Sequence, residues 1–207
     1  MAAEARVTPW AEEAFGALAP RLVDLVPECL ARAHERARDA HEGAQTQTLE
    51  AYGHGLYAAQ FEQLAMGLAD LPGADAVRLQ ARTVMVVAGH VLYPIRYAKR
   101  DTPVSTAKLR RTSGLRADLI RRHGPDPRQG ELDLGPAFEA PEDEVHGDLA
   151  KLSPDTKLVL VAYACAHHSG IVRLEWGSAE LQQQNRSLVW HHHEPLPIPR
   201  GPEQLAG

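Results

Sequence analysis

The chain has 207 residues, 44% of them hydrophobic and 24% charged, with a formal net charge of −5 at pH 7. These proportions are those of a globular protein and exclude a mainly disordered chain, a collagen and a coiled coil. The length is enough to bury a core without disulfides, and the two cysteines, Cys29 and Cys165, have no CxxC or zinc-ribbon spacing. We therefore expect a single domain over residues 1–207.

The first part of the chain, residues 1–123, is predicted to be mainly helical. Pro20 and Pro27 indicate several short helices in series near the start, because a proline inside a helix breaks or kinks it. Apolar residues recur at helical spacing in three stretches, which we predict to be helices: 8–43, 46–71 and 75–89.

The character of the sequence changes after these helices. Residues 91–98 are β-branched and aromatic, but Pro94 confines any strand there to a sheet edge or an irregular segment. Two short helices are expected next, over 106–112 and 115–123, with a Ser-Gly pair between them. They could form a helix-turn-helix whose second helix enters the major groove of DNA.

The last part of the chain is predicted to form a small antiparallel sheet, which makes the fold class α+β. Residues 124–156 are rich in proline, glycine and acidic residues and read as a long loop, with at most one short strand at 131–134. Residues 157–196 then read as a β-meander and 197–207 as a loose tail. The expected strands are 157–166, 171–176 and 187–194, with a polar connection over 177–186.

The sequence predicts no membrane partner and a cytoplasmic location. The first residues lack the apolar stretch of a signal peptide. The longest apolar run, from Thr83 to Ala98, is interrupted by His90, Pro94 and Arg96, so it is too short and too polar to span a bilayer.

A basic segment at residues 96–128 is the clearest charge feature. It holds ten Lys or Arg residues against three Asp, while the rest of the chain holds 12 basic and 24 acidic residues. The net charge of −5 therefore hides a positive stretch of the kind that binds phosphates. The candidate nucleic-acid-binding residues are Arg96, Lys99, Arg100, Lys108, Arg110, Arg111, Arg116, Arg121 and Arg122.

The leading hypothesis is a nucleic-acid-binding protein, with DNA favoured over RNA, such as a regulator or a mobile-element accessory factor. Tyr93 and Tyr97 flank Arg96, and this interleaving suits stacking on a single strand. Two alternatives remain open. The basic segment could form a pocket for an acidic ligand, or pair with the acidic residues of 139–155. Pairing of that kind between copies would make the protein an adaptor and a homo-oligomer.

Five of the 11 histidines lie in the predicted meander and give a competing enzyme hypothesis. If the strands run up, down and up, the turn after the first strand and the end of the third share one edge. Imidazoles and a carboxylate there could bind a divalent metal such as zinc, or supply a general base, in a hydrolase or nuclease. The other interpretation is that these histidines are exposed or capping. The candidate metal or catalytic residues are His167, His168, His191, His193 and Glu194, and no other cofactor is predicted.

Overall fold

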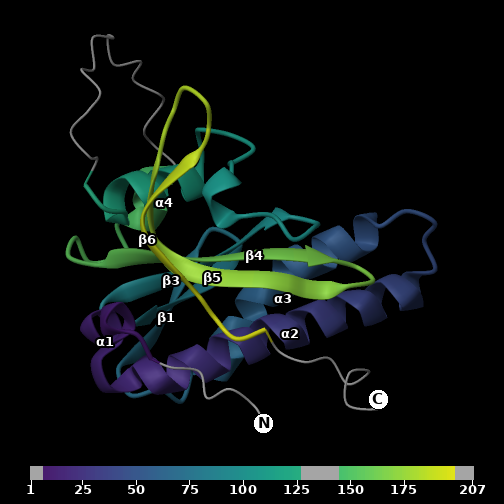
Figure 1. The fold of residues 1–207 in the computed structure, drawn as a ribbon, viewed down its shortest axis with the longest axis horizontal. Helices are drawn as coiled ribbons and strands as arrows, with labels where there is room; N and C mark the ends of the chain where they lie inside the picture. The colour runs from purple at the N-terminus through teal and green to yellow at the C-terminus, as the bar shows by residue number, and fades with distance from the viewer. Residues whose placement is uncertain (1–6, 127–144, 199–207) are drawn as a thin grey trace.

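The computed structural model describes residues 7–126 and 145–198 and confirms the α+β class, with the three N-terminal helices before the sheet and two shorter helices between its third and fourth strands (Figure 1). The α-helices are α1 (Pro9–Phe15), α2 (Ala19–Ala44), α3 (Glu50–Leu68), α4 (Leu115–His123) and α5 (Val145–Leu149), with 3-10 turns η1 (Gly16–Leu18) and η2 (Val104–Thr106). The strands are β1 (Ala74–Leu79), β2 (Arg82–Val87), β3 (His90–Ala98), β4 (Lys157–Ala166), β5 (Gly170–Leu181) and β6 (Leu188–Pro195).

The helical start of the chain bears out part of the prediction. The Thr8 hydroxyl accepts a hydrogen bond from the Ala11 N–H and caps α1, and Gly16 ends it with a positive φ of 55°. Pro20 lies in the first turn of α2, where the missing N–H costs nothing. Pro27, however, lies inside α2, which continues through it, so the expected break at this proline is not found.

The predicted helix over 75–89 is wrong, because the chain forms the antiparallel hairpin β1–β2 there. The two strands pair from Ala74 with Val87 to Leu79 with Arg82, around a tight turn in which Gln80 has a φ of 51°. Five valine and threonine side chains between residues 77 and 87 favour strands. The alanine, leucine and arginine residues among them also fit a helical pattern, and for this reason the spacing of apolar residues alone predicted a helix.

All six strands form one sheet in chain order, from β1 to β6. Neighbouring strands are antiparallel except for β3 and β4, which pair in parallel from His90 with Lys157 to Ala98 with Ala164. The sheet therefore consists of two three-stranded meanders joined along one parallel seam. The predicted meander is the second of these, and its strands β4 and β6 match the expected ranges closely. The sheet is larger than predicted, and it is mixed rather than purely antiparallel.

Helices cover both faces of this sheet (Figure 1). One core lies between the sheet and helices α1, α2 and α3, and includes Leu22, Leu64, Val161 and Trp176. A second core lies on the opposite face under η2, α4 and α5, and includes Leu119 and Leu160. The alternation of side chains along β4 supplies both cores, which explains its continuous apolar sequence.

Two further expectations need correction. The predicted helix 106–112 is absent: after η2 the chain is extended, and Leu109 N–H donates to the Arg186 carbonyl beside β6. The polar connection predicted over 177–186 is shorter, because β5 continues to Leu181. The possible strand at 131–134 lies outside the described residues. Among the helices of residues 7–126 and 145–198, none has both the length and the apolarity needed to cross a membrane.

Candidate nucleic-acid interface

The site begins where β2 and β3 diverge. These strands pair only from Met85 with Leu92 to Val87 with His90, whereas β3 continues along β4 to Ala98. Beyond Leu92, no described strand pairs with the free edge of β3. Pro94 lies in this half of the strand, so the expectation that proline would confine it to an edge is met within a six-stranded sheet.

Aromatic side chains from α3 fill the fork between the two strands. Phe61 is buried, with its ring 5.2 Å from that of Tyr93 in β3 and 5.8 Å from that of Tyr57 one helical turn earlier. Tyr57 is 39% exposed, whereas Tyr93 is buried. Phe61, which itself packs on Tyr93, therefore holds one side of the Tyr57 ring at the mouth of the fork.

Two adjoining cavities open at this fork, and together we call them the arginine cleft. They have volumes of about 440 Å³ and about 450 Å³ and share Tyr57, Arg110 and Arg116. The first is lined in addition by Glu50, Gly53, His54, Leu56, Gln60, Arg96 and Tyr163, and the second by Gln80, Ala81, Arg82, Tyr93, Leu109, Arg111, Ser113, Gly114 and Leu115.

The charge of the cleft is strongly one-sided. Five arginines line it (Arg82, Arg96, Arg110, Arg111 and Arg116), whereas Glu50 is the one acidic side chain among its described lining residues. Within residues 7–126 and 145–198, none of the five guanidinium groups forms an ion pair. Elsewhere in the molecule arginines do find carboxylates, as in the pair formed by Arg173 and Asp101 at 2.7 Å.

Three of these arginines are held by ring faces and the backbone. The guanidinium of Arg82 lies 4.6 Å from the centre of the Tyr57 ring, and that of Arg116 lies 5.8 Å from the Tyr93 ring. Arg96 donates from Nε to the Cys165 carbonyl at 2.8 Å. The Nε atoms of Arg82 and Arg116 are buried without a hydrogen-bond partner in the described part of the chain. Within the residues that the structure describes, the cleft thus positions its cations without pairing them with carboxylates.

A buried polar pair forms the floor. The Tyr163 hydroxyl of β4 donates to Oε1 of Gln60 in α3 at 2.7 Å, and Gln60 Nε2 donates to the Tyr57 carbonyl at 3.3 Å. Burial raises the pKa of Tyr163, which keeps its hydroxyl neutral. Burial likewise raises the pKa of Tyr93, against the opposing charge of Arg116. The tyrosines therefore add hydrogen-bonding groups without negative charge, and the cleft can receive an anion.

The basic segment is divided by the fold. Arg96, Arg110, Arg111 and Arg116 lie in the cleft, but the remaining predicted binding residues lie outside it. Lys99, Arg100 and Lys108 are exposed, Arg121 pairs with Asp118, and Arg122 lines a different cavity beside His123. Arg128 falls outside the described residues.

Sequence reasoning missed Arg82, His54 and Tyr57 as members of the site. Arg82 was assigned to a helix, and only the correct turn after Leu79 places it beside α3. Tyr57 and His54 lie on the exposed side of α3, outside its buried stripe, and an aromatic ring on that side is the one signal that marks the site.

The helix-turn-helix geometry is not formed, since its first helix is replaced by the extended segment after η2. The predicted second helix does exist as α4, but it buries Ala117, Leu119, Ile120 and His123 against the sheet. His123 Nδ1 also forms a 2.7 Å hydrogen bond with the Thr156 carbonyl. The apolar side of α4 is therefore occupied by its own domain.

The predicted histidine edge is divided as well. His167 and His168 lie in the β4–β5 turn beside Gly170, whereas His193 pairs with Gly177. The seven residue steps of β5 from Gly170 to Gly177 span about 23 Å. His167 instead has His168 Nδ1 at 3.4 Å and the His41 ring at 5.0 Å. Among the described residues, no three His, Cys, Asp or Glu side chains are grouped so that they could hold a metal ion.

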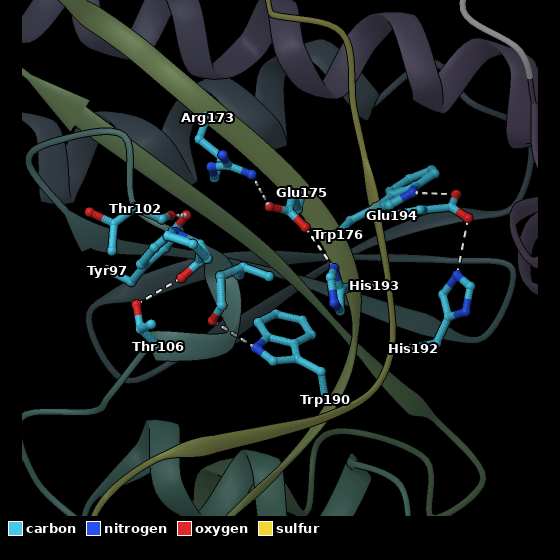
Figure 2. A network of polar contacts seen from close by, with 12 residues as sticks. Tyr97, Thr102, Thr106, Arg173, Glu175, Trp176, Trp190, His192, His193 and Glu194 are labelled. Carbon is cyan, nitrogen blue, oxygen red and sulfur yellow. Dashed lines mark hydrogen bonds and ion pairs between the residues drawn. The ribbon is translucent and has the colours of Figure 1, made fainter.

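The histidines of β6 bind carboxylates on both faces of the sheet (Figure 2). His193 Nδ1 lies 2.7 Å from Oε2 of the buried Glu175, which also accepts from Arg173 at 3.2 Å. On the opposite face, Glu194 accepts from Trp176 Nε1 at 2.8 Å and lies 3.0 Å from His192 Nε2. These contacts tie β6 to β5 and satisfy both buried carboxylates.

His191 lies beside another carboxylate, with its Nε2 3.4 Å from Glu180 Oε2. The site residues of the enzyme hypothesis thus lie at three separate places on the sheet. Comparison of the chain with protein-family models, with curated proteins and with solved structures gives no match.

Proposed function

We propose that this protein binds nucleic acid and that the arginine cleft holds the phosphates of the backbone. The observation that carries this proposal is the convergence of five arginines without ion-pair partners in the described chain. They come from β2, β3, the extended segment before α4 and α4 itself, so the fold brings Arg82 and Arg96 together with the three arginines of 110–116.

Phosphate is the ligand that best matches this set of groups. The planar guanidinium presents paired N–H donors that fit phosphate oxygens, and these charge-assisted bonds are stronger than neutral ones. Gathering like charges in a partly enclosed space is unfavourable unless an anion offsets it. A polyanion also gains from the release of its condensed counterions when the arginines replace them.

In the described part of the chain, neither Glu50, which lines the cleft, nor Asp148 at its rim forms an ion pair with a cleft arginine. Asp148 pairs with Lys151 and accepts a 2.9 Å hydrogen bond from the Gln80 N–H at the rim of the second cavity. Its carboxylate is therefore engaged beside the cleft and not with the arginines. Among the described residues, this arrangement favours an external anion over self-pairing of the basic segment, and the acidic residues of 139–144 lie outside them.

The direct test is a charge reversal with a matched control. Arg110 is exposed at the shared wall of both cavities, so Arg110→Glu changes the charge of the cleft with little effect on packing. Arg21 is exposed on the first turn of α2, and Arg21→Glu changes the net charge by the same amount at a distance. Binding of fluorescent oligonucleotides of DNA and RNA is measured by anisotropy at several salt concentrations.

We expect Arg110→Glu to weaken binding about tenfold or more at 50 mM salt and to lower the salt slope by about one. Arg21→Glu should leave both quantities near those of the unchanged protein. Equal losses in the two variants would show a non-specific charge effect, and absence of binding at low salt would end the proposal.

A further inference from the structure

The geometry points to single-stranded nucleic acid as the form that the arginine cleft accepts, with one base stacked on Tyr57 between phosphates held by the arginines. This inference rests on the proposed function and adds to it the class of nucleic acid and a base-binding residue. It is carried by the shape of the cleft and by the surroundings of one aromatic ring.

The shape of the cleft disfavours a duplex. Proteins read duplex DNA with a helix or ribbon that protrudes into a groove. Here the cations are recessed, since Arg82, Arg96 and Arg116 are only partly exposed and lie against rings and backbone. Each cavity, at about 440–450 Å³, is within the size range of small-ligand pockets. Such a space admits a nucleotide-sized group that has left its stack, not a paired helix.

Tyr57 is placed as a stacking platform between the two cavities. It lines both of them, and its 39% exposure contrasts with the burial of Tyr93 and Tyr163 beside it. Phe61 packs against it at a right angle and fixes its orientation. Arg82 lies against the ring, so a strand held there meets an aromatic surface and a cation together, the combination that single-strand binders use.

Gly53 leaves the space beside this ring open. Side chains on a helix lean toward its N-terminus, so Tyr57 extends over the position one turn earlier, which is Gly53. A Cβ built at Gly53 meets nothing within 4 Å, and the residue itself lines the first cavity. A glycine inside a helix is unfavourable relative to alanine, and here its absent side chain leaves room for a base.

The experiment compares one sequence as single strand and as duplex, using the whole chain and anisotropy at 50 mM salt. We expect the single strand to bind at least tenfold more tightly. Tyr57→Ala should weaken single-strand binding about 5- to 100-fold, the effect of losing one stacked base. Tyr57→Phe should stay within about twofold, because the ring is kept. Stacking is not ionic, so Tyr57→Ala should leave the salt slope unchanged, unlike Arg110→Glu.

Gly53 supplies a second pair of variants that does not disturb the core. Gly53→Glu and Gly53→Gln place side chains of equal size in the space beside the ring, and both should weaken binding. Gly53→Glu should cost about tenfold and more than Gly53→Gln, because it also adds a negative charge to the cleft. Circular dichroism of both variants shows whether α3 is kept.

The outcomes separate the two proposals. Absence of binding to either form overturns the proposed function together with this inference. Equal binding of duplex and single strand, or no effect of Tyr57→Ala, overturns this inference and leaves the proposed function standing. Displacement of the oligonucleotide by an equimolar mononucleotide overturns it in favour of a small-anion site.

Discussion

The hydroxyl of Tyr163 in β4 donates a 2.7 Å hydrogen bond to Oε1 of Gln60 in α3, and both side chains are buried beneath the arginine cleft. This bond ties a helix to the centre of the sheet at the point where the cations converge. It also satisfies two polar groups that burial would otherwise leave without partners.

Removing both partners of this bond should cost less than the sum of the two single removals. Tyr163→Phe leaves Gln60 Oε1 buried without its donor, and we expect the free energy of unfolding to fall by about 1–3 kcal/mol. The double variant Tyr163→Phe with Gln60→Leu should lose less than the sum of the two single variants. Urea unfolding of all four proteins measures the coupling, and simple additivity would contradict it.

Gly177 of β5 should tolerate no side chain. A Cβ there would lie 2.0 Å from the carbonyl oxygen of His192 on β6, a backbone atom that cannot move alone. Gly177→Ala should therefore separate β5 from β6 and lower the free energy of unfolding by about 3 kcal/mol or more. Gly53→Ala is the matched control, since its Cβ meets open space, and it should be neutral or stabilising. The melting temperatures of the two variants test this prediction, and equal values would contradict it.

Gly67 of α3 and Cys29 of α2 are predicted to be coupled. A Cβ at Gly67 would lie 2.3 Å from Cys29 Sγ, so Gly67→Ala should destabilise the protein by about 1–3 kcal/mol despite its better helix propensity. Cys29→Ala removes the sulfur and makes room for the added methyl group. The double variant should then recover part of the loss in chemical denaturation, and no recovery would refute the contact.

Stability should fall below pH 6.5 because of His34. Burial, reinforced by Arg38, lowers the pKa of this imidazole from 6.5 to about 4. Between these pH values the unfolded state binds a proton at His34 and the folded state does not. The free energy of unfolding therefore falls as the pH is lowered from 6.5 toward 4. The slope is at most about 1.4 kcal/mol per pH unit for one group.

His34→Gln provides the comparison for that titration. Its free energy of unfolding should depend less on pH between 6.5 and 4 than that of the unchanged protein. Met66 is exposed on α3 and does not titrate, so Met66→Gln serves as the control and should keep the original slope. Identical slopes in the His34→Gln variant and the unchanged protein would assign the effect to other groups.

The sequence correctly predicted those elements whose local hydrophobic pattern agrees with their burial in the folded protein. The α3 helix and strand β4 fall within their expected ranges because long, regular apolar patterns determine both. The β1–β2 hairpin was missed since its residues satisfy a helical spacing as well, and pairing with β3 decides between the two. Residues 107–109 became extended for the same reason, through bonds to the start of β6.

The candidate site was predictable only in part. The charge excess of residues 96–128 identified four of the five cleft arginines, but nothing local shows that Lys99 and Arg100 lie outside while Arg82 lies inside. The expected meeting of His168 with His193 failed because β6 ends level with Glu175, several residues short of the β4–β5 turn. Whether two distant side chains come together depends on where strands end and how long the loops are, and these features are the hardest to predict from a sequence.

The parallel seam between β3 and β4 has a consequence for how the chain folds. Each three-stranded meander contains only neighbouring strands joined by connections of two to six residues, so each can close quickly. The seam must instead bring Ala98 and Lys157 segments together across nearly 60 intervening residues. The entropic cost of closing a loop rises only slowly with its length, but the chain must meet this cost before the contacts of the seam can stabilise it. Docking of two preformed halves is therefore the expected slow step, and a chain cut between them should still reassemble from its two fragments.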